Sequence, residues 1–293
     1  MKKRIGGKIA LNLFLFLGSL TFIIPLVMMC SISLSAENAI TEYGYTVLPK
    51  VFSTAAYKSV FENPHQIIQA YKVTIAFSIL GTVLSMLIQS MMAYSLSKSD
   101  FTGRKFFTGM LLFTMLFNGG LVPSYILNTQ YLHLGNTFWI YIFPTLVSAF
   151  NVFMFRTNIA ALPDGLLEAA KLDGASEFTI YFKIVFPLII PILASLGFLT
   201  LLGRWNDWNT ALLYIRDSEL YSLQYLLQRI LNEADYIKQM QKAGTTSMFD
   251  AKNIPGESLR YAMAVVAAGP MLVVFPFFQK YLSKGLTVGS VKG

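Results

Sequence analysis

The sequence predicts an all-α integral membrane protein with about six spanning helices. Of its 293 residues, 55% are hydrophobic and only 13% are charged, and the mean hydropathy is +0.55. Soluble domains carry about 25% charged residues, so this composition indicates a chain that resides in a bilayer. Six apolar stretches are long enough for the roughly 20 residues that a spanning helix requires. They are residues 9–33, 67–97, 105–127, 137–160, 182–203 and 258–281.

The first stretch has features of both a signal peptide and a spanning helix. Four basic residues precede it within residues 2–8, as in a secretory signal. The apolar run over residues 9–32 is longer than the roughly 7–15 residues of a signal peptide, and the Leu-Ser-Ala sequence at 34–36 is a weak cleavage site. We therefore expect a retained first helix.

Lysine and arginine in the short loops predict the orientation, because these residues gather on the cytoplasmic side. The N-terminal tail, the loop after the second stretch and the C-terminal tail are basic. Residues 34–66 carry only Lys50 and Lys58, and residues 128–136 carry neither type. We expect both termini of this multi-pass protein in the cytoplasm. This bias also accounts for the net charge of +8 without nucleic-acid binding.

The same topology assigns the remaining loops of a single membrane domain, residues 1–293. Residues 161–181, here called the charged segment, fall in the cytoplasm, and the loop 204–257 falls outside. Within that loop, the polar residues 232–253 predict a short helix followed by a flexible stretch.

The charged segment has the local signals of two short helices at an angle. Asp164 can cap the start of the first helix, and Gly174 can end it in the left-handed conformation. Ser176 can cap the second helix, which leads towards the fifth stretch. Helices this short are unstable alone, so we expect the segment to dock on a partner. An ordinary interfacial helix is the alternative.

The charged segment resembles the cytoplasmic signature of the permease subunits of binding-protein-dependent ABC importers. That signature reads Glu-Ala-Ala, three residues, Gly, nine residues, Ile, one residue, Leu-Pro. Phe186 replaces the usual Leu, and the other signature positions match at the same spacing: Glu168, Ala169, Ala170, Gly174, Ile184 and Pro187. The resemblance implies that the segment is a coupling helix, which sits in a cleft of an ATPase subunit.

The resemblance also implies a role for individual residues of the charged segment. Glu168 would reach a basic residue of the ATPase, the small alanines would allow close approach, and Gly174 would make the bend. The expected docking residues are Glu168, Ala169, Ala170, Asp173, Gly174 and Ala175.

Three further stretches are similar to maltose-type permeases, especially those for larger oligosaccharides such as alginate: residues 118–137, 204–215 and 284–293. The resemblance implies the fold of a type I importer permease and a location in the bacterial inner membrane. It also implies a second related permease, two ATPase subunits and an extracytoplasmic solute-binding protein as partners. ATP and Mg would bind to the ATPase subunits, and this chain, which lacks a Walker-type glycine loop, would bind no cofactor.

In such permeases a C-terminal tail reaches between the ATPase subunits. Residues 285–293 match that tail, which implies ATPase contacts for Gly285, Thr287, Gly289 and Lys292. A frayed terminus is the alternative.

Polar and aromatic residues in or beside the spans are candidates for the sugar path or for contact with the binding protein. A sugar site requires aromatic faces and a few polar groups. The candidates are Asn118, Tyr125, Asn151, Trp205, Asn206, Asp207 and Trp208. An interfacial aromatic belt and hydrogen bonds between helices are the alternatives. For an acidic sugar, Arg156 and Arg204 are candidate sources of positive charge.

The function predicted for the chain is therefore transport of an oligosaccharide, acidic if the alginate resemblance holds, and not an enzymatic reaction. Import of another small solute stays open. An intramembrane enzyme would require a nucleophile–base pair or a metal cluster, and Cys30, His65 and His133 lie far apart in the sequence. A passive channel would not require the signature of the charged segment.

Overall fold

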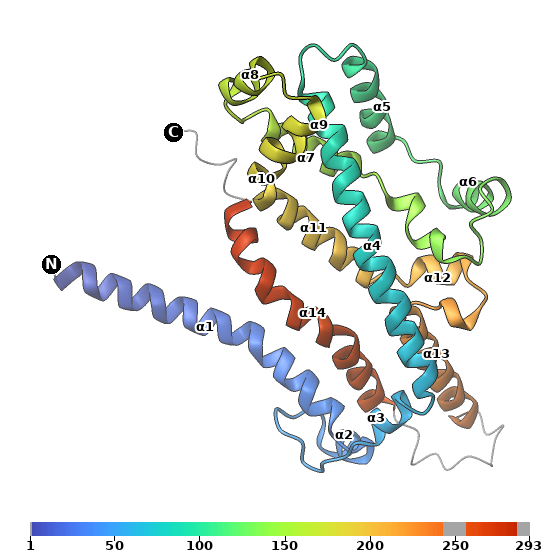
Figure 1. Ribbon diagram of the computed structural model, residues 1–293. Helices are drawn as coiled ribbons and strands as arrows, with labels where there is room; N and C mark the ends of the chain where they lie inside the picture. The colour runs from blue at the N-terminus through green and yellow to red at the C-terminus, as the bar shows by residue number, and fades with distance from the viewer. Residues whose placement is uncertain (1, 243–255, 286–293) are drawn as a thin grey trace. The chain divides into compact units, whose positions relative to one another are not determined.

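The computed structural model describes residues 2–242 and 256–285, and over these residues the chain is built from helices, with one isolated β-bridge and no strand (Figure 1). The chain divides into two compact units, residues 1–67 with 226–270 and residues 68–225 with 271–293. The helices are α1 (Lys2–Ser33), α2 (Glu37–Tyr43), α3 (Ala55–Val60), α4 (Pro64–Ser97), α5 (Arg104–Leu116), α6 (Leu121–Ile126), η1 (Leu127–Tyr131), η2 (Phe138–Tyr141), η3 (Phe143–Thr145), α7 (Ala149–Ile159), α8 (Asp164–Leu172), α9 (Glu177–Ile180), η4 (Tyr181–Val185), α10 (Phe186–Leu188), α11 (Ile190–Trp205), α12 (Asn209–Tyr214), η5 (Ser218–Leu220), α13 (Leu223–Lys242) and α14 (Glu257–Gly285).

The prediction of an all-α membrane protein with up to six spans is confirmed. Among the described residues, three helices are long and apolar enough to cross a membrane, over Leu11–Ser33, Pro64–Ser97 and Glu257–Leu282. Three further candidates are pairs of helices that bend at a short break. The third, fourth and fifth predicted stretches therefore correspond to bent helix pairs rather than to single continuous helices.

The break in the third stretch is the sharpest, with an angle of 118° between Arg104–Leu116 and Leu121–Tyr131. Asn118 accepts a hydrogen bond through Oδ1 from the backbone N–H of Gly120 at 2.8 Å. Gly120 has φ +88°, a conformation that disfavours residues with a Cβ. An asparagine turn followed by a left-handed glycine therefore ends α5 inside an apolar run.

The other two breaks have caps and prolines as their causes. Ser148 starts α7 by accepting a hydrogen bond through Oγ from the N–H of Asn151, and the helices before and after it differ in direction by 51°. Pro187 and Pro191 flank the 78° bend at Ile189, where neither proline has an N–H to continue the helical hydrogen bonds.

In the unit formed by residues 1–67 and 226–270, the carboxylate of Glu37 caps the N-terminus of α14. Glu37 of α2 accepts hydrogen bonds from the backbone N–H groups of Glu257 at 2.9 Å and Ser258 at 3.0 Å. Burial raises the pKa of Glu37, but these hydrogen bonds outweigh that effect and hold the pKa below its ordinary value. A negative charge at a helix N-terminus is also favoured by the helix dipole.

The loop predicted over residues 204–257 is largely helical where it is described. It contains α12, η5 and the 20-residue α13, so the short helix expected near residue 232 is the end of a longer one. Residues 243–255, where the flexible stretch was expected, lie outside the described residues.

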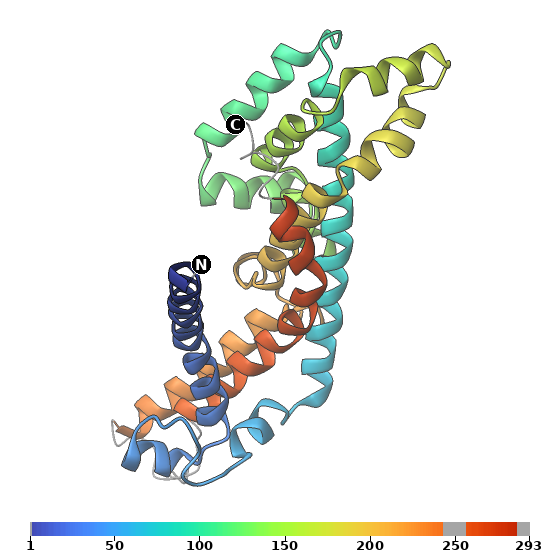
Figure 2. The same ribbon diagram turned by 90° about the vertical axis from the view of Figure 1, so that its left-hand side faces the viewer.

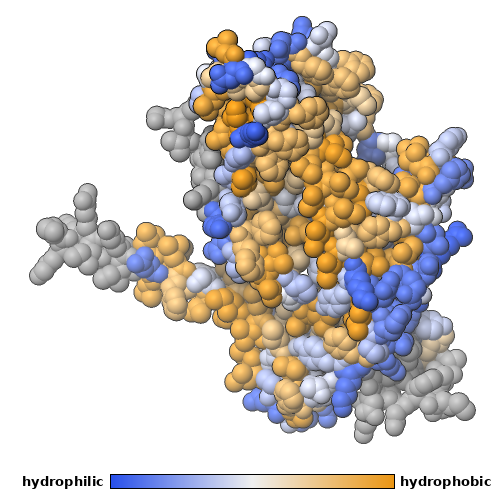
Figure 3. All heavy atoms as spheres, in the orientation of Figure 1, coloured by the Kyte–Doolittle hydropathy of each residue, from blue (hydrophilic) through white to orange (hydrophobic). Residues whose placement is uncertain are grey.

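In the other unit, α4 is the central helix, and apolar residues cover much of the visible middle of this unit in Figure 3. Phe77 of α4 stacks on Tyr141 at 4.3 Å between ring centroids, and Gln89 donates to the carbonyl of Leu146 at 2.7 Å. Both contacts fix the irregular segment η2–η3 against α4.

Arg204 joins the same elements from α11. Its guanidinium donates to the carbonyl oxygens of Tyr141 at 2.8 Å and Thr145 at 3.1 Å, and to the hydroxyl of Ser85 at 2.9 Å. The Arg204 side chain is buried, and its guanidinium packs against the backbone of Gly81 in α4. A Cβ on Gly81 would lie only 2.7 Å from Nη1 of Arg204. Arg204 is therefore a structural group that satisfies the carbonyls freed by the η2–η3 break.

We predict that Gly81→Ala destabilises the protein by about 1–3 kcal/mol, because the added methyl group overlaps the guanidinium and displaces it from its hydrogen bonds. The measurement is thermal unfolding of the purified protein in detergent. Gly203→Ala, next to Arg204 on α11, is the matched control, because its Cβ would meet no atom within 4 Å. Equal unfolding temperatures for the two variants would contradict the close packing of Gly81 on Arg204.

Candidate functional site

The charged segment folds as two short helices, α8 and α9, that meet at a defined turn. Gly174 has φ +74°, as the sequence predicted. Its N–H donates to the carbonyl of Lys171, and the N–H of Ala175 donates to that of Ala170, both at 3.0 Å. These two bonds form a Schellman motif, which fixes the direction in which the chain leaves α8.

The start of α9 also follows the prediction, whereas the start of α8 does not. Ser176 accepts a hydrogen bond through Oγ from the N–H of Thr179 at 3.3 Å and so caps α9. The cap position of α8 is Pro163, and Asp164 is the first residue inside the helix. Proline favours the extended conformation that a cap residue adopts, with φ −61° and ψ 124° here.

Figures 1 and 2 place α8 and α9 beside the C-terminal end of α4, and a set of polar contacts joins them there. We call it the α4 contact network; it consists of Ser90, Tyr94, Lys98, Glu177 and Tyr181. Ser90 and Tyr94 of α4 and Lys98, which directly follows α4, are spaced by four and so lie on the same side of that helix end. The hydroxyls of Ser90 and Tyr181 are 2.6 Å apart, Tyr94 donates its hydroxyl to Glu177 at 2.6 Å, and Lys98 forms an ion pair with the same carboxylate oxygen.

A second charged contact links α8 itself to the loop that follows α4. The ammonium nitrogen of Lys171 lies 3.7 Å from Asp100 Oδ2 and 3.7 Å from Glu177 Oε1. These groups are solvent-exposed, so each pair contributes only about 0–1 kcal/mol. Together with the α4 contact network they orient both short helices.

Ala170 packs α8 onto a buried apolar cluster of the chain. Ala170 is 9% exposed and belongs to the same buried cluster as Ile159 and Ile180. Ala169 and Glu168 are exposed. The two neighbouring alanines of the signature thus differ: Ala170 permits close packing within this chain, and Ala169 faces outward.

The outward face of the charged segment combines acidic and apolar groups. Glu168 and Asp173 are exposed and have no ion-pair partner among the residues described. Leu172 and Phe178 are 89% and 66% exposed. Sequence reasoning missed these two residues. The sequence signal for Leu172 was its spacing from Ala170. Positions i and i+2 of a helix point in directions about 200° apart, so Leu172 faces away from the buried Ala170.

The predicted residues around Trp205 do not share one environment. Trp205 is 3% exposed and its ring lies 6.4 Å from that of Tyr71, whereas Trp208 is 45% exposed. Asp207 accepts a hydrogen bond from the N–H of Thr210 near the start of α12, and Asn206 is exposed. Of the two indoles, only Trp208 presents a large face to its surroundings.

The other predicted path residues form contacts of their own within the chain. Asn118 stabilises the turn after α5, Tyr125 stacks on Tyr214 at 5.5 Å, and Asn151 donates to the hydroxyl of Thr200 at 3.4 Å. Arg204 is buried by its structural contacts, and Arg156 lies in a separate cavity beside α5. Arg204 directly precedes Trp205, but its guanidinium is engaged by Tyr141, Ser85 and Thr145 rather than directed to a sugar.

Only one of the predicted tail residues is described. Gly285 is the last residue of α14. Thr287, Gly289 and Lys292 lie outside the described residues.

Comparisons with known proteins give the context of this geometry. Residues 105–288 match the family described as "Binding-protein-dependent transport system inner membrane component". The polygalacturonan/rhamnogalacturonan transport system permease protein YtcP of Bacillus subtilis (strain 168) is 32% identical over 280 residues, which cover 96% of each chain. The arabinooligosaccharides transport system permease protein AraQ of the same organism is 30% identical, covering 98% of this chain and 96% of that protein.

A solved structure is similar over almost the full length. It is a crystal structure of a bacterial ABC transporter involved in the import of the acidic polysaccharide alginate. One of its chains superposes with a TM-score of 0.78 at 28% identity, covering 96% of this chain and 98% of that chain. The family model, the relatives and the similar solved structure agree. The chain belongs to the family of inner membrane components of binding-protein-dependent transport systems.

Proposed function

We propose that this chain is the transmembrane subunit of an ATP-driven importer for an oligosaccharide, and that the charged segment receives the movement of an ATPase subunit. The observation that carries the proposal is the pairing of an exposed outer face with a fixed inner face on α8 and α9. Glu168 and Leu172 are free to contact a partner, while Ala170 and Glu177 hold the segment to the chain. A surface linker would need no such division.

In the proposed mechanism the charged segment moves as a rigid piece. The ATPase subunits bind and hydrolyse ATP with Mg, and their closure displaces α8. The Schellman turn at Gly174 and the α4 contact network pass that displacement to α4 and to the bent helix pair that begins at Glu177. Rigid-body movement of these spans would open the sugar path first to one side of the membrane and then to the other.

We infer an oligosaccharide as the substrate because the relatives YtcP and AraQ carry names of saccharide transport systems. An acidic, alginate-like sugar is the finer proposal, and it rests on the similarity to the alginate transporter. Trp208 is the exposed aromatic residue of the Trp205–Trp208 segment and is the candidate for contact with a sugar or a binding protein, since an aromatic face suits a sugar ring. The proposed partners are a second related permease, two ATPase subunits and a solute-binding protein.

The orientation that this mechanism requires has both termini and the charged segment in the cytoplasm, which the lysine and arginine bias supports. In a Cys30→Ser background, a membrane-impermeant thiol reagent applied to intact cells should label Glu42→Cys and leave Gly165→Cys unlabelled. Both positions are exposed in the structure. The reverse pattern of labelling would require the opposite orientation.

We predict that Glu168→Lys and Gly174→Val each lower substrate uptake by at least about tenfold while the chain still inserts. The lysine removes a charge-assisted contact of about 1.5–3 kcal/mol and adds repulsion. The valine is strained at φ +74° and turns α9 away from its position. The measurements are uptake, copurification of the ATPase subunits and ATPase activity stimulated by the loaded binding protein.

The matched controls are Glu42→Lys and Gly44→Val, both outside the charged segment. Glu42 is an exposed acid on α2, and Gly44 has φ +73°, close to that of Gly174, with no atom within 4 Å of an added Cβ. Normal uptake by both test variants would show that the charged segment is a surface linker.

A further inference from the structure

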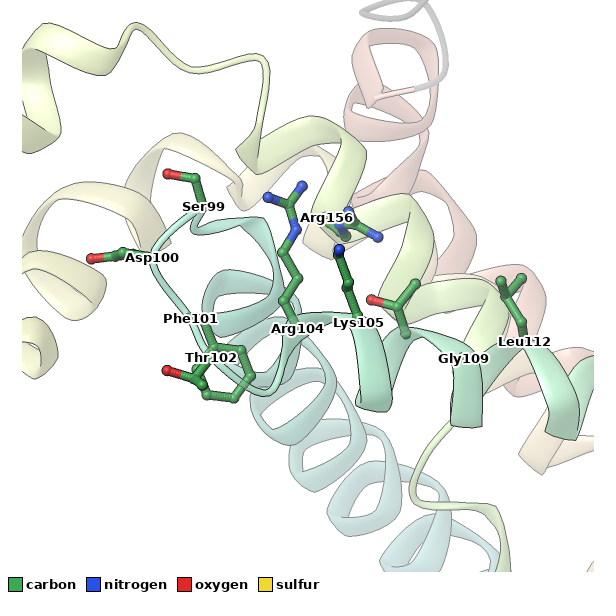
Figure 4. Close-up of a pocket in the computed structure, with 10 residues that line it drawn as sticks. Ser99, Asp100, Phe101, Thr102, Arg104, Lys105, Gly109, Leu112 and Arg156 are labelled. Atoms are coloured by element: carbon green, nitrogen blue, oxygen red, sulfur yellow. The ribbon is translucent and has the colours of Figure 1, made fainter.

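A cavity of about 700 Å³ lies beside the C-terminal end of α4 (Figure 4). Its walls come from the loop after α4, from the first turns of α5 and from the last turn of α7, which contributes Arg156. The mechanism proposed above does not use this cavity. We call it the basic cavity.

Three cationic side chains meet in the basic cavity. Figure 4 shows the charged ends of Arg104, Lys105 and Arg156 gathered on one side of it. None of the three has an ion-pair partner within the described part of the chain. Like charges brought together repel, so an anion between these groups would lower the free energy of the arrangement.

The single acidic residue of the lining does not supply that anion. Asp100 points away from the three cations in Figure 4, and its Oδ2 atom lies 3.7 Å from Lys171 of α8. The cavity therefore keeps an uncompensated positive charge.

Two neutral features add to the preference for an anion. The 13-residue helix α5 begins at Arg104 and has no acidic residue in its first turn, so its positive dipole end is unmatched. Thr108 also lines the cavity, and its hydroxyl oxygen is buried without a hydrogen-bond partner in the described structure. A phosphate oxygen could accept the hydrogen bond that this hydroxyl can donate.

The surroundings of the cavity distinguish a lipid from a free ion. The cavity lies at the end of α4, one of the candidate spans, where the headgroup layer would be. Leu112 belongs to its lining, and Leu116 follows one turn later on the same face of α5. These two leucines are 47% and 77% exposed. A cationic end followed by an exposed apolar stripe matches a molecule with a charged head and an acyl chain.

We propose that the basic cavity binds the phosphate group of an anionic phospholipid, with an acyl chain along Leu112 and Leu116. Arg104, Lys105 and Arg156 contact the phosphate, and Thr108 donates a hydrogen bond to it. The same loop carries Asp100, which contacts α8, so the bound lipid also stabilises the loop that holds the charged segment.

The test uses the full chain purified with its partner subunits in detergent. Native mass spectrometry counts the lipids retained after incubation with phosphatidylglycerol or with phosphatidylcholine, each with and without inorganic phosphate. We expect at least about tenfold preferential retention of phosphatidylglycerol, unaffected by millimolar phosphate. Equal retention of the two lipids would overturn the proposal, and so would displacement by phosphate, which would show a site for the free ion.

Variants locate the retained lipid. Arg104→Gln/Lys105→Gln/Arg156→Gln should lower the retention of phosphatidylglycerol at least about tenfold, whereas Arg104→Lys/Arg156→Lys keeps the charge and should retain it. Lys183→Gln is the control, because it removes an exposed lysine outside the cavity. If the triple variant does not assemble, Leu112→Ser/Leu116→Ser serves in its place and should lower retention without removing charge. Wild-type retention by an assembled cavity variant would place the lipid elsewhere and refute the proposal.

Discussion

The contact of Glu177 with Tyr94 and Lys98 is the interaction on which the arrangement of the charged segment depends. Helices of nine and four residues, such as α8 and α9, are too short to be stable in water on their own propensity. One carboxylate at the start of α9 contacts the hydroxyl of Tyr94 in the last turn of α4 and the ammonium group of Lys98, which directly follows that helix. The helix pair that begins at Glu177 continues into α11. This contact therefore fixes both the charged segment and a candidate span to α4.

Positively charged residues have two different roles in the chain, one structural and one as a candidate ligand site. The buried cation has the structural role, and the cations that line a cavity form the candidate site. Arg204 is buried, and its guanidinium donates hydrogen bonds to two carbonyls of the irregular segment η2–η3 and to the Ser85 hydroxyl of α4. Arg104, Lys105 and Arg156 have no such partners within the described residues and line an open cavity. A positive charge inside an apolar chain thus marks a structural joint in the first case and a candidate ligand site in the second. The sequence alone treats Arg156 and Arg204 alike.

The sequence predicted the features that neighbouring residues determine and missed those that depend on contacts between residues far apart in the chain. Apolar stretches and the local signals of Gly174 and Ser176 predicted the spans and the turn of the charged segment, because composition and single-turn chemistry determine them. The 118° break after α5 was missed although Asn118 and Gly120 carry its chemistry, since the apolar run continues on both sides. The inward position of Ala170 and the burial of Trp205 against Tyr71 arise from contacts between residues far apart in the chain. No local pattern contains them.

The central claim is that the charged segment and the end of α4 move as one body, and a distance measurement tests it most directly. Spin labels at Gly165→Cys on α8 and Ser95→Cys on α4, both exposed positions, would report the separation in the assembled transporter with and without ATP. The account predicts one narrow distance distribution that nucleotide leaves unchanged, and a broader one after Glu177→Gln. A distance that shifts with ATP in the otherwise unaltered protein would contradict it, because α8 would then move independently of α4.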